Sequence, residues 1–274
     1  QEYGVGIFDM VPTKSALKKA LKKGFVQVDN SIATSATLIQ GGETISLSIP
    51  ADTEPKNRLI FPLKVLFEDE YLAVIHKPAG ILVSGNSFKT IVSALPQNLT
   101  RSTLSDASSP QPVHRLDYPT TGLLLVGKTS SSIRALNKLL ENHEVEKTYY
   151  AVTIGEMKQE GELTSDIDDK KSQSYCSVVE SVPSKRFGTL NLVRLKPQTG
   201  RRHQLRKHLS ILGNPILGDK NYGQEDLILK GKGLYLHAYS LTFIHPLTNQ
   251  KISIIDELPT RFERIFSTTR NLPD

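Results

Sequence analysis

The sequence predicts an α+β protein of two unequal domains, in which short strands outnumber helices. Three observations support this fold class. Residues 12–24 form a helical pattern followed by two strand-like segments, residues 51–62 are rich in proline and charge, and most apolar runs beyond residue 63 are short and strand-like. We therefore expect a small helix-plus-hairpin module at 1–50, a linker at 51–62, and a main domain at 63–274 with a mixed, largely antiparallel sheet and flanking helices.

Composition favours an anionic partner. The 274 residues contain 34 Lys+Arg and 28 Asp+Glu, which gives a formal net charge of +6, so nucleic acid is favoured ahead of a membrane surface. The single cysteine, Cys176, excludes an internal disulfide and a multi-thiolate zinc site and fits a reducing compartment. No apolar run approaches the roughly 20 residues needed to span a bilayer. We expect a cytoplasmic protein with no membrane partner.

The helix predicted at 12–24 is amphipathic with a basic outer face. Its inward residues are Ala16, Leu17, Ala20 and Leu21, and its outward residues are Lys18, Lys19, Lys22 and Lys23. Strands are expected after it at 25–28 and 44–49. The lysines are either a solvated face or a surface that binds the phosphates of a polyanion. The helix alone favours the solvated face, because runs of charge are usually solvated.

The main domain alternates strand patterns with two long helices. Strands are expected at 65–67, 72–76, 123–126, 147–154, 175–179, 187–195, 234–245 and 250–255. Helices are expected at 130–142 and at 199–212, where Leu205, Leu209 and Leu212 form an apolar stripe. The polar segments 96–111 and 156–174 are expected to be connections without strands.

Chemistry-bearing residues are most concentrated in 112–129, PVHRLDYPTTGLLLVGKT. Asp117 lies in a turn that precedes the apolar run 123–126, which we expect to be a buried strand. Residues 122–129 match the G-x-x-x-x-G-K-[ST] pattern of a phosphate loop. That loop must expose backbone N–H groups, whereas Leu-Leu-Leu-Val requires burial, so we reject a nucleotide-binding function.

Two other interpretations of Asp117 remain. A metal site built from His114, Asp117, His203 and His208 is disfavoured, because neither pair has a characteristic spacing and several arginines would repel a cation. The other interpretation is that Asp117 is a reactive carboxylate, which an arginine of the segment 201–206 keeps in its charged form. Spacing alone does not distinguish that arrangement from a structural ion pair with Arg115.

A resemblance resolves this ambiguity. The segment 112–129 resembles the HRLD-x-x-[ST]-[ST]-G-LL signature of RluA-type RNA pseudouridine synthases, with Thr121 where many members carry serine. Further blocks similar to that family recur in order: EDEYLAVIHKPAGILV, EKTYYAVTIG, TGRRHQLRKHL with NPILGDKNYG, and YLHAYSLTFIHP. Together they cover most of residues 63–250. The lysine helix followed by GFVQVDN and GGETISL resembles a small RNA-binding module found in a ribosomal protein and in many RNA-modifying enzymes.

The resemblance implies three catalytic residues. Asp117 matches the aspartate that starts cleavage of the glycosidic bond of a uridine, either by attacking the ribose or by removing a ribose proton. Tyr149 matches the tyrosine that stacks on the flipped base and helps to remove the proton from carbon 5. Arg206 best matches the arginine that pairs with the aspartate, and Arg201 is the alternative.

RNA is the implied partner. Arg115 would fill the space that the extruded base leaves in the RNA stack, with His114 and Arg201 beside it as RNA-binding residues, and the resemblance now favours Lys18, Lys19, Lys22 and Lys23 as phosphate contacts. The isomerisation needs no metal, nucleotide or other cofactor, and we expect a monomer acting on ribosomal or transfer RNA. The alternative is an RNA-binding protein that retains the synthase fold without catalysis.

Overall fold

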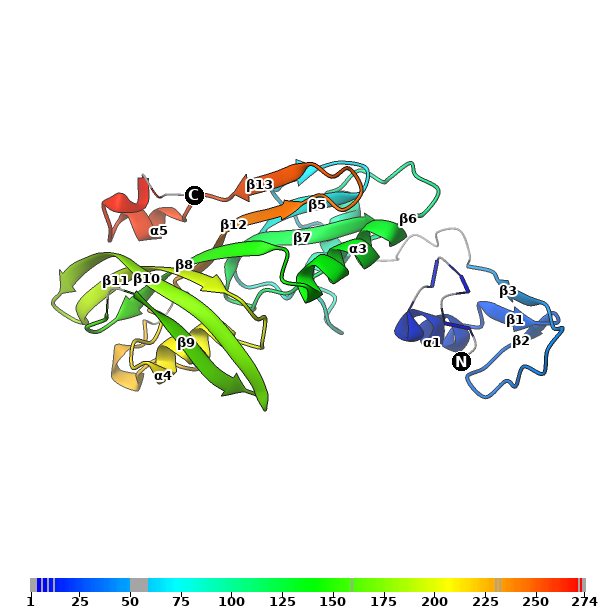
Figure 1. The fold of residues 1–274 in the computed structure, drawn as a ribbon, viewed down its shortest axis with the longest axis horizontal. Coiled ribbons are helices and arrows are strands. Elements are labelled where there is room, and N and C mark those ends of the chain that lie inside the picture. The colour runs from blue at the N-terminus through cyan, green and yellow to red at the C-terminus, as the bar shows by residue number, and fades with distance from the viewer. Residues whose placement is uncertain are drawn as a thin grey trace.

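The computed structural model describes residues 4–5, 7–8, 10–11, 13–49, 59–158, 160–229, 231, 233–270 and 272. It contains a small N-terminal body and a much larger one built on a single sheet (Figure 1). Most of the linker expected at 51–62 lies outside the described residues, because these omit 50–58. No helix in the described part of the chain is long and apolar enough to cross a membrane.

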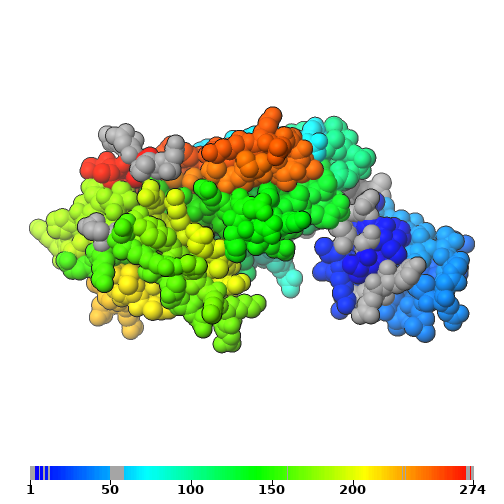
Figure 2. Space-filling model, viewed as in Figure 1, coloured from blue at the N-terminus to red at the C-terminus, as the bar shows by residue number. Residues whose placement is uncertain are grey.

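The N-terminal body consists of one helix and a three-stranded antiparallel sheet. Helix α1 (Lys14–Lys22) is followed by β1 (Val26–Val28), β2 (Ser31–Ile32) and β3 (Ile45–Leu47), in the order β2-β1-β3. Leu17, Ala20 and Leu21 of α1 are buried against β1 in a core drawn entirely from residues 8–47. Figure 2 shows these blue residues gathered in a body of their own.

The larger body is a ten-stranded sheet, mixed but largely antiparallel as predicted. Its main path is β4-β5-β7-β12-β8-β11-β10-β9, with β13 paired to β12 and β6 paired to β7. The strands are β4 (Val65–Glu68), β5 (Leu72–Lys77), β6 (Ala107–Pro112), β7 (Thr121–Thr129), β8 (Glu146–Ile154), β9 (Glu160–Ile167), β10 (Lys170–Ser184), β11 (Gly188–Pro197), β12 (Leu236–Ile244) and β13 (Lys251–Ile255). Among the described strands, only β7 and β12 pair in parallel.

Strand β7 runs through the middle of the core. Leu123 and Leu125 pack on one face with Leu136 of helix α3 (Ser130–Glu141), whereas Leu124 and Val126 pack on the other face. Both faces are therefore covered, which explains why the strand is apolar at every position rather than at alternate ones. The remaining helices are α2 (Ile91–Ala94), α4 (Gln204–Ile211) and α5 (Thr260–Glu263), with short 3-10 turns η1 (Leu95–Gln97), η2 (Glu225–Leu227) and η3 (Thr268–Arg270).

Several local predictions are wrong. Strand β6 begins within the segment 96–111, and the segment 156–174 contains β9 and the start of β10. Strand β6, ASSPQP, pairs only with β7 and so tolerates its prolines at the edge of the sheet. Helix α4 begins at Gln204 rather than at 199, because His203 adopts a left-handed conformation with φ 56°.

Gly122 sits where β7 meets β12 and cannot carry a side chain. Its φ is +111°, and a Cβ there would lie 2.2 Å from the carbonyl oxygen of Ala238. We expect Gly122→Ala to lower the free energy of unfolding by about 3 kcal/mol, through backbone strain and overpacking. Gly161→Ala is the control, because nothing lies within 4 Å of its Cβ position. Equal denaturation midpoints for the two variants would contradict this prediction.

Candidate active site

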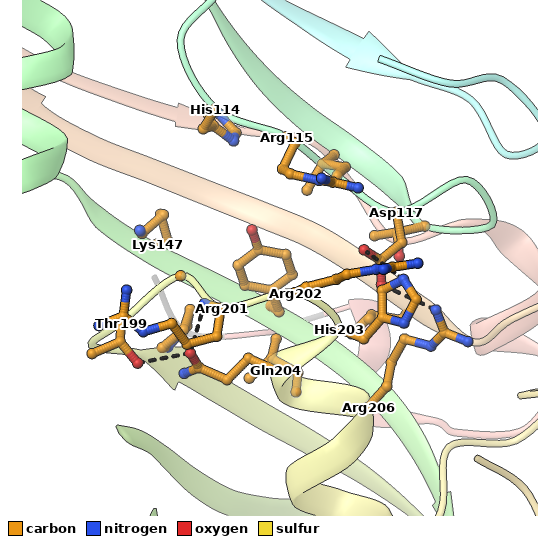
Figure 3. Close-up of a pocket in the computed structure, with 17 residues that line it drawn as sticks. His114, Arg115, Asp117, Lys147, Thr199, Arg201, Arg202, His203, Gln204 and Arg206 are labelled. Atoms are coloured by element: carbon orange, nitrogen blue, oxygen red, sulfur yellow. Dashed lines mark hydrogen bonds and ion pairs between the residues drawn. The ribbon is translucent and has the colours of Figure 1, made fainter. Parts of the chain in front are cut away.

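A pocket of about 240 Å³ brings together the sequence blocks that carry the chemistry (Figure 3). The turn between β6 and β7 contributes His114, Arg115 and Asp117, and β8 contributes Lys147 and Tyr149. The segment that leads into α4, together with its first turn, contributes Thr199, Gly200, Arg201, Arg202, His203, Gln204, Leu205 and Arg206. Residues far apart in the sequence therefore meet in one pocket of the sheet.

Arg206 connects Asp117 to a second carboxylate. Its Nη1 atom donates to Asp117 Oδ2 at 3.2 Å, while Nε and Nη2 donate to Asp219 Oδ2 and Oδ1 at 2.7 and 2.8 Å. Asp219 is fully buried and also accepts the backbone N–H groups of Asn221 and Tyr222. The two-pronged contact fixes the plane of the guanidinium, so its third nitrogen faces Asp117.

Arg201, the alternative partner of Asp117, points elsewhere. It is exposed, and its Nε donates to the carbonyl oxygen of Lys171 at 3.3 Å. The geometry thus brings Arg206, rather than Arg201, against the carboxylate. Asp219 was missed in the sequence, although it lies within the NPILGDKNYG block and could have been found as the nearest acidic residue to α4.

A buried lysine fixes the backbone of the turn that carries Asp117. Lys77 is completely buried, and its Nζ donates to the carbonyl oxygens of Pro78, Tyr118 and Thr120 at 3.0, 3.3 and 2.8 Å. Burial lowers the pKa of this ammonium to about 8, with an opposing effect from Asp117. Its three carbonyl contacts fix the backbone on both sides of Pro119, immediately after Asp117.

Tyr149 and Lys147 share one face of β8, whereas Tyr150 lies on the other. Burial, and then the negative charge of Asp117, raise the pKa of the Tyr149 phenol well above its usual value. Tyr150 is fully buried and packs edge-to-face on Tyr239 at 5.0 Å. Tyr149 therefore offers the pocket a neutral aromatic ring with a protonated hydroxyl.

The side chain of His114 is fixed by a hydrogen bond, whereas that of Arg115 is exposed. The Nε2 atom of His114 accepts the backbone N–H of Leu125 at 3.0 Å, which ties the turn to β7. Burial, followed by repulsion from Lys147, lowers the pKa of His114 to about 4, so the ring is neutral near pH 7. Arg115 is exposed at the pocket wall, where a ligand can reach it.

His203 is a further residue of the pocket that the motifs did not identify as functional. Its Nε2 lies 3.8 Å from Asp117 Oδ1, and its Nδ1 is 2.8 Å from the hydroxyl of Tyr222. Its left-handed backbone could not be read from the sequence. His208, which the metal interpretation grouped with it, instead has its Nε2 atom 2.8 Å from the hydroxyl of Ser172. No group of three or more His, Cys, Asp or Glu in the described ranges could hold a metal ion.

Two other sequence features lie outside this pocket. The phosphate-loop letters at 122–129 fall within the buried strand β7, where Lys128 pairs with Glu68 at 2.7 Å. The exposed lysines of the N-terminal body lie on α1 and just beyond it, and Lys18, Lys22 and Lys23 line a shallow hollow beside Ile32.

Comparison with known proteins identifies relatives that match large parts of the chain. Residues 71–211 match the family model described as RNA pseudouridylate synthase. The ribosomal large subunit pseudouridine synthase D of Nitrosomonas europaea is 31% identical over 95% of this chain and 81% of its own length. The tRNA pseudouridine synthase C of Pasteurella multocida is 35% identical over 70% of this chain and 90% of its own length.

The fold is similar to that of a solved relative. Human RNA pseudouridylate synthase domain containing 4 superposes with a TM-score of 0.60 at 25% identity, covering 77% of this chain and 95% of that one. The family model spans more than half of the sequence, and the Nitrosomonas relative matches nearly all of it. These matches confirm the resemblance seen in the motif blocks, and the chain belongs to the RNA pseudouridylate synthase family.

Proposed function

We propose that this protein converts uridine to pseudouridine in the RNA of the large ribosomal subunit, with Asp117 as the reactive carboxylate. The observation that carries the proposal is the contact of 3.2 Å between Asp117 and Arg206 in a pocket that also contains Tyr149. The hydrogen bond from Arg206 orients the carboxylate in the pocket, and both a nucleophile and a base need such a fixed position. Asp117 then either attacks the ribose or removes a ribose proton.

The pocket suits a base that has been turned out of the RNA. Uracil stacks on the Tyr149 ring, and Arg115 fills the space that the base leaves in the stack. His114 and Arg201 contribute polar contacts at the pocket wall. Uracil is detached, rotated and rejoined through carbon 5, so the reaction requires no oxidant, nucleotide or metal.

The share of the chain that the relatives match favours ribosomal RNA over transfer RNA as the substrate. Relatives named for the ribosomal large subunit match nearly the whole chain, whereas those named for tRNA match a smaller share of it. We propose the same division that the sequence suggests, namely an RNA-binding module at 1–50, a linker at 51–62 and a catalytic domain at 63–274. We propose further that the protein is cytoplasmic and monomeric. Light scattering of the purified chain measures its molar mass and so tests the monomeric state.

The test of the function is tritium release. RNA carrying [5-³H]uridine loses its label to water when carbon 5 becomes bonded to the ribose. We expect release from large-subunit ribosomal RNA at a higher kcat/KM than from transfer RNA. Binding of ribosomal RNA without any release from either RNA would support the non-catalytic alternative instead.

The N-terminal lysines give a separate prediction. Replacing Lys18, Lys19, Lys22 and Lys23 by alanine should weaken RNA binding and reduce the slope of log K against log salt by about 3, because each phosphate contact contributes slightly less than one to that slope. All four are exposed, so folding should not change. A control variant replaces Lys138 and Lys158, which lie outside this cluster. An unchanged salt slope in the fourfold variant would show that the lysines are only solvated.

A further inference from the structure

An exposed aromatic residue lies directly beside Asp117. Tyr118 is the next residue of the chain, and consecutive Cα atoms are about 3.8 Å apart. Tyr118 is not among the residues that line the pocket, and it is 54% exposed. Its ring therefore belongs to the surface that adjoins the pocket rather than to the pocket itself.

The described residues make little use of the Tyr118 side chain. None of the hydrogen bonds between them involves its hydroxyl, and none of their aromatic rings or cations packs on its ring. Tyr118 also belongs to none of the four apolar cores. By contrast, the hydroxyl of Tyr175, another partly exposed tyrosine, donates to Glu160 at 2.6 Å. Contacts within the described part of the fold thus do not explain why position 118 carries an aromatic residue.

The backbone that carries this ring is fixed. The carbonyl oxygen of Tyr118 accepts hydrogen bonds from the Gly80 N–H at 2.9 Å and from Lys77 Nζ at 3.3 Å. The hydroxyl lies close to Gly80, because a Cβ on that glycine would be 3.8 Å from it. A tyrosine has only two side-chain torsions, so a ligand that stacks on this ring orders little that is not already ordered.

The segment after this glycine continues the surface with apolar and basic side chains. Leu82 and Phe88 are 39% and 53% exposed, and Lys89 is exposed as well. Residues 78–105 contain Lys89 and Arg101 but no Asp or Glu. Exposed rings together with positive charge suit unpaired nucleotides, whose bases stack on aromatic side chains and whose phosphates are anionic.

We propose that the Tyr118 ring is a stacking platform for an unpaired base next to the target uridine. This inference rests on the proposed function and deepens it, because it defines the substrate as a uridine with an unpaired neighbour. The ribose of the target must meet Asp117, so the nucleotides joined to it leave the pocket across the surrounding surface. Tyr118 is the exposed ring nearest in the chain to that ribose, and it selects RNA through the neighbouring base.

Tyr118→Leu tests the proposal in the full-length protein, because leucine removes the aromatic face and keeps an apolar side chain. The probes are RNA hairpins with one uridine in an unpaired loop, either intact or with an abasic nucleotide on the 5′ or the 3′ side of that uridine. Tyr118→Leu should bind the intact hairpin about 10-fold more weakly than the wild type, as expected for the loss of one stacked base. An abasic nucleotide on one of the two sides should weaken binding by the wild type about as much, and binding by Tyr118→Leu hardly at all.

Two further variants separate stacking from other roles. Tyr118→Phe keeps the ring and should bind like the wild type. Tyr175→Leu removes an exposed tyrosine that does not line the pocket, and it should leave the affinity for every hairpin unchanged. If Tyr118→Leu bound the intact hairpin as tightly as the wild type, as a surface for a protein partner predicts, the stacking role would be wrong. A loss of the same factor on intact and abasic hairpins would also contradict it.

Binding and tritium release distinguish this inference from the proposed function. Tritium release from ribosomal RNA, with no effect of Tyr118→Leu on hairpin binding, would refute the stacking platform alone. The expected binding pattern in a protein that releases no tritium from ribosomal or transfer RNA would refute the proposed function and leave the platform in place.

Discussion

Asp117→Asn should abolish pseudouridine formation while leaving the protein folded. The amide keeps the shape of the side chain but can act neither as a nucleophile nor as a base, so we expect tritium release to fall by at least about 10³-fold. The backbone of the turn is held by Lys77 and does not depend on the carboxylate. Binding of ribosomal RNA should therefore persist.

The matched control is Asp106→Asn. Asp106 accepts the backbone N–H of Ser131 at the start of α3, and it is not among the residues that line the pocket. This variant should retain the wild-type rate of tritium release. If Asp117→Asn were as active as Asp106→Asn, the assignment of Asp117 as the reactive group would be wrong.

Asp219→Asn should lower both the free energy of unfolding and the catalytic rate, although Asp219 does not line the pocket. The side chains of Asp219 and Arg206 are 0% and 5% exposed, so loss of one charge leaves the other poorly compensated in the core. Breaking a buried ion pair costs about 3–5 kcal/mol. The loosened guanidinium should also lower kcat by about 10²-fold, because small misplacements of a catalytic group are costly.

Denaturant unfolding and single-turnover rates measure these two effects. Asp168→Asn is the comparison, because Asp168 pairs with Lys207 on the surface with 62% of its side chain exposed. It should change neither the unfolding midpoint nor the rate. If Asp219→Asn resembled Asp168→Asn in both measurements, Arg206 would not depend on Asp219 for its position.

The elements best predicted from sequence are those that one strong local pattern of apolar residues specifies. Strand β7 was recognised from its uninterrupted leucines, and α1 from the spacing of Leu17, Ala20 and Leu21 between lysines. Strand β6 was not, since its serines and prolines form a strand only because β7 offers a partner. The start of α4 was misplaced because a single left-handed residue, His203, interrupts an otherwise helical pattern.

The site itself could be read only in part. The motif blocks predict Asp117, Tyr149 and Arg206 as site residues, but the contact between Asp117 and Arg206 joins residues 89 positions apart and cannot follow from local spacing. Asp219 was missed because its importance comes from burial under Arg206 rather than from a motif position. The sequence presents His203 only as a candidate metal ligand, since nothing in it shows that the ring contacts the Tyr222 hydroxyl beside Asp117.

The cage of carbonyls around Lys77 has a consequence for how the enzyme could diversify. It holds Tyr118 and Thr120 by their main chains, so the geometry next to Asp117 does not depend on which side chain occupies position 118. The Tyr118 side chain points outward and is 54% exposed. We therefore expect substitutions at position 118 to change the exposed surface beside Asp117 while the backbone of the turn keeps its contacts with Lys77.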